Sequence, residues 1–181
     1  MRKIIFIHYF WNLVIFLSFS STVAWGETLR CDAEWNFSWC GEVLLKRQGL
    51  YYQPFTDVPF TGIVTGAWSG IVKDGKKEGL WRYYRPKGGQ LYFKGKYTKG
   101  EREGFWLEFN NSSSAQVKSK IYWWNGNRHG PSCKYEFGPP SYQRALNKEQ
   151  SGIYENGKLV KNYLTHPQLE TGLLESFCKE D

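Results

Sequence analysis

The stretch that decides the fold is residues 70–84, GIVKDGKKEGLWRYY, because it recurs further along the chain. Its equivalents are residues 95–109, GKYTKGEREGFWLEF, and residues 121–135, IYWWNGNRHGPSCKY. Each copy carries two glycines in a Gly-x-x-x-Gly spacing: Gly75 and Gly79, Gly100 and Gly104, Gly126 and Gly130. A degenerate fourth copy ends the series around Gly157. Repetition of this kind indicates an architecture in which one small unit is stacked on the next.

Each unit has the pattern of a β-hairpin. Asp74-Gly75 and Asn125-Gly126 are typical of the two-residue hairpin turn, in which both central residues need positive φ. Lys99-Gly100 and Asn156-Gly157 occupy the same place in their units. The strand that follows the first turn alternates, which places Trp81 and Tyr83 on one side and Leu80 and Arg82 on the other.

The repeat predicts an all-β fold, since a single hairpin cannot bury its apolar side alone. Stacked hairpins solve this problem, so we expect an elongated, twisted antiparallel meander sheet. Trp81 and Trp106 are expected in its core rather than in an exposed ladder. The second glycine of each pair (Gly79, Gly104, Gly130) is expected to let a neighbouring aromatic ring pack onto bare backbone.

The two ends of the chain carry different patterns. Arg2 and Lys3, the apolar run 4–19, and the small residues Ala24 and Gly26 predict a signal peptide over 1–26, cleaved after Gly26. An uncleaved membrane anchor is the alternative. At the other end, Leu169, Leu173, Leu174 and Phe177 recur at helical spacing, which predicts a short helix that caps the open sheet edge. The expected organisation is a capping segment at 27–58, repeats at 59–164 and a helical tail at 165–181.

All four cysteines, Cys31, Cys40, Cys133 and Cys178, follow the predicted signal peptide. An even number in an exported chain predicts two disulfides, and sequence alone leaves three pairings open. Proximity along the chain favours Cys31–Cys40 with Cys133–Cys178. A structural zinc site is not expected, because no Cys-x-x-Cys pair occurs and few histidines remain after cleavage. No cofactor is expected.

The pattern from Tyr97 through Gly100 and Gly104 to Trp106 resembles the MORN (membrane occupation and recognition nexus) repeat. Residues 74–81, DGKKEGLW, and the lead-in 55–62, FTDVPFTG, are similar to the bacterial YwqK-type antitoxin repeats, and the resemblance covers about residues 51–160. It implies hairpins stacked into an elongated, curled sheet. It also implies scaffolding, binding to proteins or acidic phospholipids, or neutralisation of a toxin by binding, and it implies no catalytic residue.

The charge pattern predicts a binding surface. The formal net charge is +7, and removal of Arg2 and Lys3 with the signal peptide leaves +5. Alternation places basic and aromatic side chains together on one sheet face: Lys94, Lys96, Lys118, Lys120, Tyr92 and Tyr122. Such a face suits an acidic lipid, an anionic envelope polymer or an acidic protein. The alternative is a solvated outer face. Nucleic acid is not expected as the partner of an exported protein.

Candidate catalytic groups are few. Glu78 and Glu103 occupy equivalent places and offer the paired carboxylates of a wall-active hydrolase. The alternative reading is a charge that recurs beside each turn for structural reasons. His129 and His166 lack any catalytic motif around them. We therefore expect an exported, non-enzymatic binding or scaffolding protein, soluble or membrane-associated in the periplasm or outside the cell. An antitoxin or immunity protein is the alternative.

Overall fold

The computed structural model describes residues 27–31, 43–85, 89–111, 116–138, 143–166, 168–169 and 172–179. The predicted signal peptide lies outside these residues, as does Cys40. The strands and the helix are, in chain order, β1 (Glu27–Cys31), β2 (Leu45–Arg47), β3 (Leu50–Tyr52), β4 (Gly62–Gly66), β5 (Trp68–Lys73), β6 (Lys76–Tyr84), β7 (Leu91–Thr98), β8 (Glu101–Phe109), β9 (Val117–Trp124), β10 (Asn127–Gly138), β11 (Gln143–Leu146), β12 (Gly152–Glu155), β13 (Lys158–Asn162) and α1 (Leu173–Lys179).

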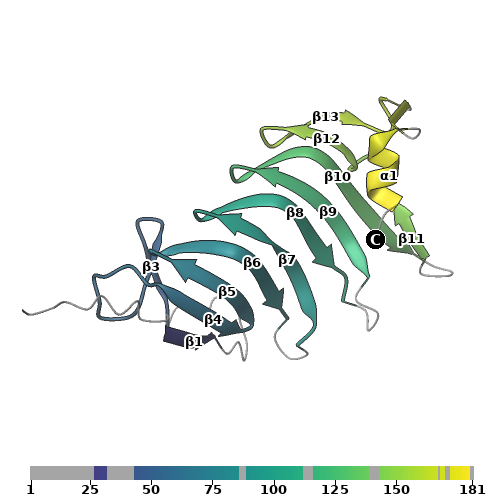
Figure 1. Cartoon of the computed structure of the whole chain (residues 1–181). Coiled ribbons are helices and arrows are strands. Elements are labelled where there is room, and N and C mark those ends of the chain that lie inside the picture. Colours follow the sequence, from purple (N-terminus) through teal and green to yellow (C-terminus); the bar gives the residue numbers. More distant parts are fainter. Residues whose placement is uncertain are drawn as a thin grey trace, which may run out of the picture.

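One long sheet makes up most of the molecule. Its 11 strands follow the order β1-β4-β5-β6-β7-β8-β9-β10-β12-β13, with β11 paired to the far end of β10. Figure 1 shows these strands following one another in chain order along an open, elongated sheet. The predicted antiparallel meander is therefore confirmed. It departs from prediction at β1, which joins the edge of the sheet by pairing parallel to β4.

The turns adopt the backbone that the sequence predicts. Both central residues have positive φ at all four expected hairpins: Asp74 (50°) and Gly75 (74°), Lys99 (51°) and Gly100 (90°), Asn125 (47°) and Gly126 (75°), Asn156 (48°) and Gly157 (84°). A fifth turn of this type, at Gln48 (49°) and Gly49 (83°), joins β2 to β3. Positive φ at both residues matches the twist of the flanking strands, which explains why glycine recurs there.

The core rests on two tryptophans that each pack on a glycine in the other strand of the same hairpin. A Cβ at Gly70 would lie 2.4 Å from the Trp81 ring, and one at Gly95 would lie 2.2 Å from the Trp106 ring. The Trp81 indole N–H donates to the Ile71 carbonyl at 3.1 Å, and that of Trp106 donates to the Lys96 carbonyl at 3.0 Å. Both rings are buried, which confirms the predicted core position.

The glycines that receive these rings are not the ones the sequence analysis chose. At Gly79 and Gly104 a Cβ would meet nothing within 4 Å, whereas φ is +68° and +71°. Gly130 has φ +70° and only an ordinary contact with Tyr122. These three glycines therefore supply positive φ at irregular places in the ladder, and the predicted packing role was wrong for Gly79 and Gly104.

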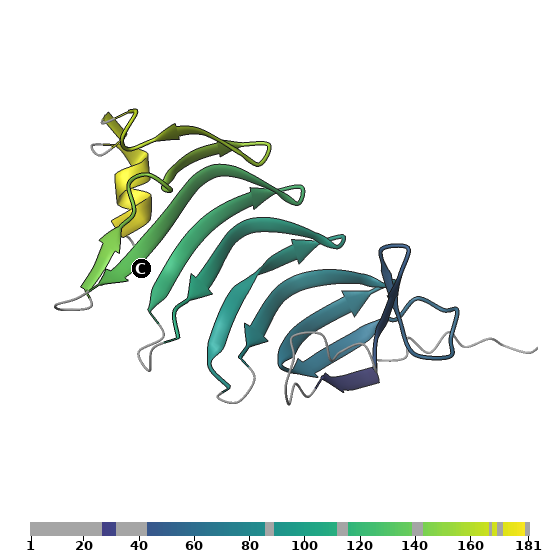
Figure 2. The ribbon, with the colours of Figure 1, turned by 180° about the vertical axis from the view of Figure 1, so that it is seen from behind.

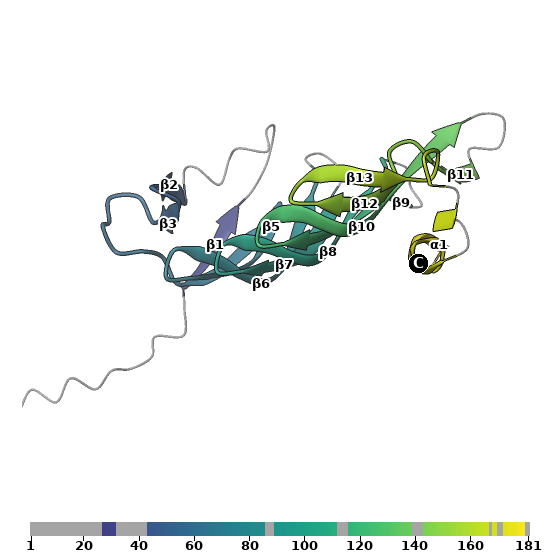
Figure 3. The ribbon, with the colours of Figure 1, turned by 90° about the horizontal axis from the view of Figure 1, so that it is seen from above.

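The two faces of the sheet differ. Cross-strand pairing places Val72 opposite Lys77 and Trp81 opposite Gly95, so these residues share one face, called here the tryptophan face. Leu80 pairs with Lys96 and Arg82 with Lys94 on the opposite face. Viewed nearly edge-on, the β2–β3 hairpin and α1 lie on different sides of the sheet and near different ends of it (Figure 3).

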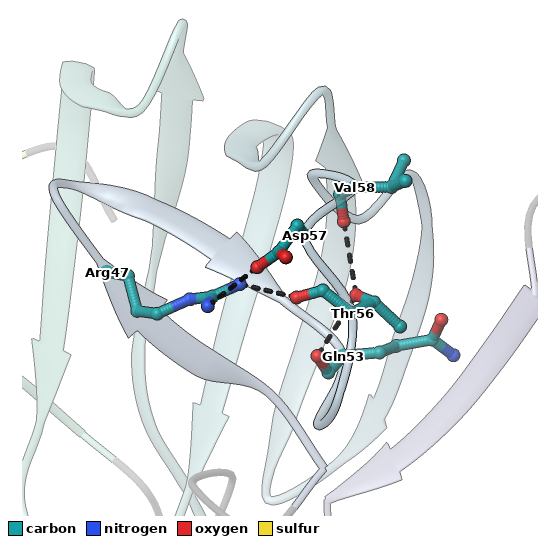
Figure 4. A network of polar contacts seen from close by, with 5 residues as sticks. All are labelled: Arg47, Gln53, Thr56, Asp57 and Val58. Atoms are coloured by element: carbon teal, nitrogen blue, oxygen red, sulfur yellow. Dashed lines mark hydrogen bonds and ion pairs between the residues drawn. The ribbon is translucent and has the colours of Figure 1, made fainter.

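The β2–β3 hairpin is attached to the first repeat through backbone hydrogen bonds. Tyr51 N–H donates to the Gly75 carbonyl at 2.8 Å, and Phe60 N–H donates to the Tyr51 carbonyl at 2.9 Å. Arg47 braces the following loop, since its guanidinium pairs with Asp57 at 3.1 Å and also donates to the Thr56 carbonyl (Figure 4). The hairpin is thereby held beside the first turn of the repeats.

The C-terminal helix confirms another prediction, but its place differs. The Cys133–Cys178 disulfide ties α1 to β10, with a sequence separation of 45. Figure 2 shows the helix against the end of the sheet where β10 and β11 lie. It covers a face there, whereas the edge strand β13 leaves Leu159 and Val160 exposed. The predicted capping of the edge was therefore wrong. Cys31, buried beside β4, is also disulfide-bonded.

Replacement of Gly95 by alanine tests the packing of tryptophan on glycine. The added methyl would lie 2.2 Å from the Trp106 ring, so the ring must move and break its hydrogen bond to Lys96. We expect a loss of about 2–3 kcal/mol in the free energy of unfolding, as for an overpacked core. Urea unfolding followed by tryptophan fluorescence measures it. Gly138→Ala is the matched control, because its Cβ meets nothing within 4 Å; equal losses in both variants would contradict the packing role of Gly95.

Removal of the Cys133–Cys178 disulfide tests the attachment of α1. The bond closes a long loop, with a sequence separation of 45. Loop-closure entropy predicts that Cys133→Ser/Cys178→Ser lowers the free energy of unfolding by about 4 kcal/mol. Amide hydrogen exchange should increase more in α1 than in β6 and β7, because α1 also loses its local attachment to β10. Exchange that rises equally in β6 would show instead that the disulfide supports the whole sheet.

Candidate ligand-binding pocket

A pocket of about 340 Å³ lies where the β2–β3 hairpin meets the turns of successive repeats. Its lining includes Gly49, Gly100 and Gly126, each the second residue of a hairpin turn. Four basic side chains from the strands β2, β6 and β8 come together there: Lys46, Lys76, Lys77 and Arg102. The lining contains one carboxylate, that of Glu101. The pocket is therefore strongly cationic.

Lys77 is the most unusual residue of the pocket, because its side chain is buried, with 7% exposed. Its ammonium lies over five aromatic rings at 4.6–5.3 Å from their centroids: Trp68, Trp81, Tyr83, Tyr51 and Tyr97. It donates one hydrogen bond, to the Tyr83 hydroxyl at 3.0 Å. No described carboxylate forms an ion pair with it. The rings attract the ammonium through their negative faces.

Burial lowers the pKa of Lys77 to about 8, because the charged form loses its hydration. The positive charges of Lys46 and Arg102 lower it further. Attraction to the five rings acts in the opposite direction, since it favours the protonated form. At neutral pH the ammonium is thus present but costly, and a bound anion would stabilise it.

The tyrosines around Lys77 form a connected layer. The hydroxyls of Tyr83 and Tyr97 are 3.1 Å apart, and Tyr83 also accepts from Lys77. Burial raises the pKa of Tyr83 far above its usual value, and burial also raises the pKa of Tyr51. The hydroxyls of Tyr51 and Tyr83 therefore stay neutral at physiological pH, so these two residues position Lys77 through hydrogen bonding and ring contact alone.

Arg102 forms the other wall of the pocket. Its guanidinium lies 4.6 Å from the ring centroids of both Trp106 and Trp123. Within the described part of the chain, no carboxylate pairs with it. The indole N–H of Trp123, which lines the same pocket, is buried and has no acceptor among the described residues. Both rings hold the guanidinium in a fixed position, where its N–H donors are available to an anion.

The lysines predicted to form one binding surface have different surroundings. Lys94 and Lys96 lie on the face opposite the tryptophans, and Lys94 lies 5.5 Å from the Phe109 ring. Lys118 pairs with Glu108 at 2.9 Å. Lys120 donates to the Phe177 carbonyl of α1 at 3.0 Å and lies over the Phe177 ring. Tyr122 packs on Phe105, and Tyr92 lies under Arg85. Lys94 and Lys96 therefore share one part of this face, whereas Lys118 pairs with Glu108 and Lys120 contacts α1.

The repeated glutamates have a structural role. The Glu78 carboxylate accepts the N–H of Lys99 at 2.8 Å, and the Glu103 carboxylate accepts that of Asn125 at 3.2 Å. Each therefore fixes the first residue of the next hairpin turn. His129, at the equivalent place in the third unit, packs instead on the Trp124 ring. His166 contacts the hydroxyl of Thr165.

Lys77 and Arg102 were not among the residues predicted to bind a ligand, although the sequence contains a pattern that points to them. Lys77, Arg102 and Arg128 each follow a turn glycine by two residues, so a basic residue recurs at this place. Period-two alternation also puts Lys77 on the side of Trp81 and Tyr83. Only the position of the β2–β3 hairpin, which brings Lys46 and Tyr51 to the pocket, gave no sequence signal.

Other features of the described residues give weaker indications of a binding or catalytic site. A second pocket, of about 400 Å³, lies between β10, β11 and α1, but its Lys179 is paired with Glu175. The described residues contain no cluster of three or more potential metal ligands. In the part of the chain that the structure describes, no helix has the length and apolarity to cross a membrane.

Comparisons with known proteins add no further evidence. No protein-family model matches the chain, and no curated protein and no solved structure is significantly similar to it. The resemblance to MORN and YwqK-type repeats therefore stays a prediction.

The depressed pKa of Lys77 predicts how stability depends on pH. Between about pH 8 and pH 10 the unfolded chain keeps the proton that folded Lys77 has lost, so stability rises with pH, by up to about 3 kcal/mol. Above pH 10 unfolded tyrosines ionise while Tyr83 stays protonated, so stability falls again. Urea unfolding at a series of pH values measures the curve.

Lys77→Met is the control for this pH dependence, because methionine fills similar space without a titrating group. We expect its free energy of unfolding to stay level between pH 8 and pH 10. A rise of the same size in Lys77→Met would show that another group causes the effect.

Proposed function

We propose that this protein is an exported, non-enzymatic binding module that holds an anionic ligand in the pocket beside the β2–β3 hairpin. The observation that carries the proposal is the buried ammonium of Lys77, which has no carboxylate partner among the described residues. A buried cation of this kind is costly unless a counter-charge accompanies it. A ligand anion supplies that charge.

The rest of the pocket supports the same conclusion. Lys46, Lys76 and Arg102 lie around Lys77, and mutual repulsion of like charges makes each of them favour an anion. The walls that separate them are Tyr51, Tyr97 and Trp123. Aromatic rings lower the local dielectric and so strengthen the attraction between the cations and a bound anion.

A binding role fits the pocket better than a catalytic one. Lys46, Lys77 and Arg102 lie over aromatic rings, which restrict their motion. The neighbouring Glu78 and Glu103 carboxylates accept hydrogen bonds from backbone N–H groups. A hydrolase of the paired-carboxylate type needs those groups free to reach the substrate. Export, expected from the pattern of residues 1–26, places the ligand in the cell envelope or outside the cell.

Binding of dextran sulfate to the mature protein, residues 27–181, tests the proposal, with uncharged dextran as the neutral probe. We expect binding at low salt that weakens as salt screens the charges. The variant Lys46→Ser/Lys76→Ser/Arg102→Ser should bind about tenfold more weakly or worse, a loss of at least about 1.4 kcal/mol. Isothermal titration calorimetry measures each affinity.

The matched control removes the same number of charges from the opposite face, as Arg82→Ser/Lys94→Ser/Lys96→Ser. Its affinity should stay close to that of the unchanged protein. Equal weakening of both variants would mean that net charge alone attracts the polymer. Weakening of the control alone would favour the lysine surface predicted from sequence.

A further inference from the structure

A cationic side chain occupies the same place in three consecutive repeats. Lys77 in β6, Arg102 in β8 and Arg128 in β10 each lie two residues beyond a turn glycine. Their backbone carbonyls are held alike, because each accepts the N–H of the second turn residue of the next unit: Gly100, Gly126 and Gly157, at 2.8–3.1 Å. The repeat therefore fixes all three positions in the same register.

Each of these cations lies on aromatic rings of the tryptophan face. Lys77 lies over Trp81, and Arg102 lies over Trp106 and Trp123. Arg128 lies 5.9 Å from the Trp123 ring and 5.6 Å from the Tyr154 ring. None of the three forms an ion pair with a carboxylate of the described residues. Charges and rings thus alternate along the face, in what is called here the cationic ladder (Lys77, Arg102, Arg128).

The spacing of the ladder follows from the sheet. One strand separates β6 from β8 and another separates β8 from β10, so successive cations lie about 10 Å apart. Exposure increases in the same direction, since Lys77 is buried, Arg102 is half-buried and Arg128 is exposed. The pocket is therefore the closed end of a row that opens over Trp123 toward Tyr154.

We propose that the ligand is a linear acidic polysaccharide with one anionic group in every disaccharide, bound along the cationic ladder with one end in the pocket. This inference rests on the proposed function and names its ligand. A disaccharide is comparable in length to the distance between successive cations, so alternate sugars bring their carboxylate or sulfate groups to Arg102 and Arg128. The apolar face of the sugar between Arg102 and Arg128 packs on the partly exposed ring of Trp123.

Two other polyanions fit this row less well. A nucleic-acid strand carries a phosphate about every 3.4 Å, far closer than the ladder, which leaves most of its charges unpaired. A membrane presents its head groups in a plane, whereas Lys77 lies buried at the bottom of a pocket. The alternation of cation and ring matches a chain in which charged and uncharged units alternate.

Calorimetric titration of residues 27–181 with hyaluronan di-, tetra- and hexasaccharides tests the inference, since these carry one carboxylate per disaccharide. Affinity should increase with length up to the hexasaccharide. Arg102→Gln should weaken every oligosaccharide. Arg128→Gln should weaken the hexasaccharide by about fivefold, the loss expected for one exposed ionic contact, and leave the disaccharide unchanged. Glutamine retains much of the side chain that packs on the rings.

Arg82→Gln is the control, because Arg82 is an exposed arginine of the opposite face; its affinities should not change. Neutral chitin oligosaccharides, single-stranded DNA and vesicles of anionic lipid serve as competing probes. Three results would contradict the proposal that the ligand is an acidic polysaccharide. These are an affinity that does not depend on oligosaccharide length, an unchanged affinity in Arg128→Gln, and stronger binding of DNA or vesicles than of the oligosaccharides. If the pocket variant Lys46→Ser/Lys76→Ser/Arg102→Ser still binds dextran sulfate more weakly than the unchanged protein, the proposed function holds even when the polysaccharide proposal fails. If the pocket variant binds dextran sulfate as tightly, the proposed function fails as well.

Discussion

The packing of a tryptophan on a glycine of the preceding strand, within one hairpin, is the contact on which the rest of the structure depends. Trp81 on Gly70 and Trp106 on Gly95 leave no room for a Cβ, and each indole N–H is bonded to the carbonyl that follows the glycine. The same contact fixes how the two strands of each hairpin lie against one another. In the third unit Ser132 replaces the tryptophan and lies opposite Ile121, so a larger residue fills the place of the glycine.

This contact also explains why cations accumulate beside the rings. In the first two units the tryptophan ring that packs on a glycine also contacts a basic side chain: Lys77 lies over Trp81, and Arg102 lies over Trp106. The attraction of a cation to the ring keeps the charge on the core side of the sheet without a carboxylate partner. Stability and the proposed ligand binding therefore depend on the same residues, Lys77 above all.

The other face of the sheet is covered at one end and exposed at the other. At its C-terminal end α1 covers β10 through Cys178 and takes Lys120 as a partner. Toward the N-terminal end, Ile71, Leu80 and Phe105 stay about half exposed. The lysines of this face thus have different surroundings at the two ends of the sheet. The alternation of the sequence is the same along the repeats and does not predict this difference.

Sequence by itself determined the repeat unit, its turn type, the meander and the core position of the tryptophans. These features are local, because turn chemistry and period-two alternation act within one hairpin and the repeat copies the result. The Cys133–Cys178 half of the favoured disulfide pairing was also found.

Tertiary structure alone decided which glycines receive the rings, since Gly70 and Gly79 look alike along the chain but only Gly70 lies beneath Trp81. It also placed the β2–β3 hairpin over the first turn and α1 on a face rather than an edge. Those placements depend on contacts between segments far apart in the chain, and no periodic pattern encodes them.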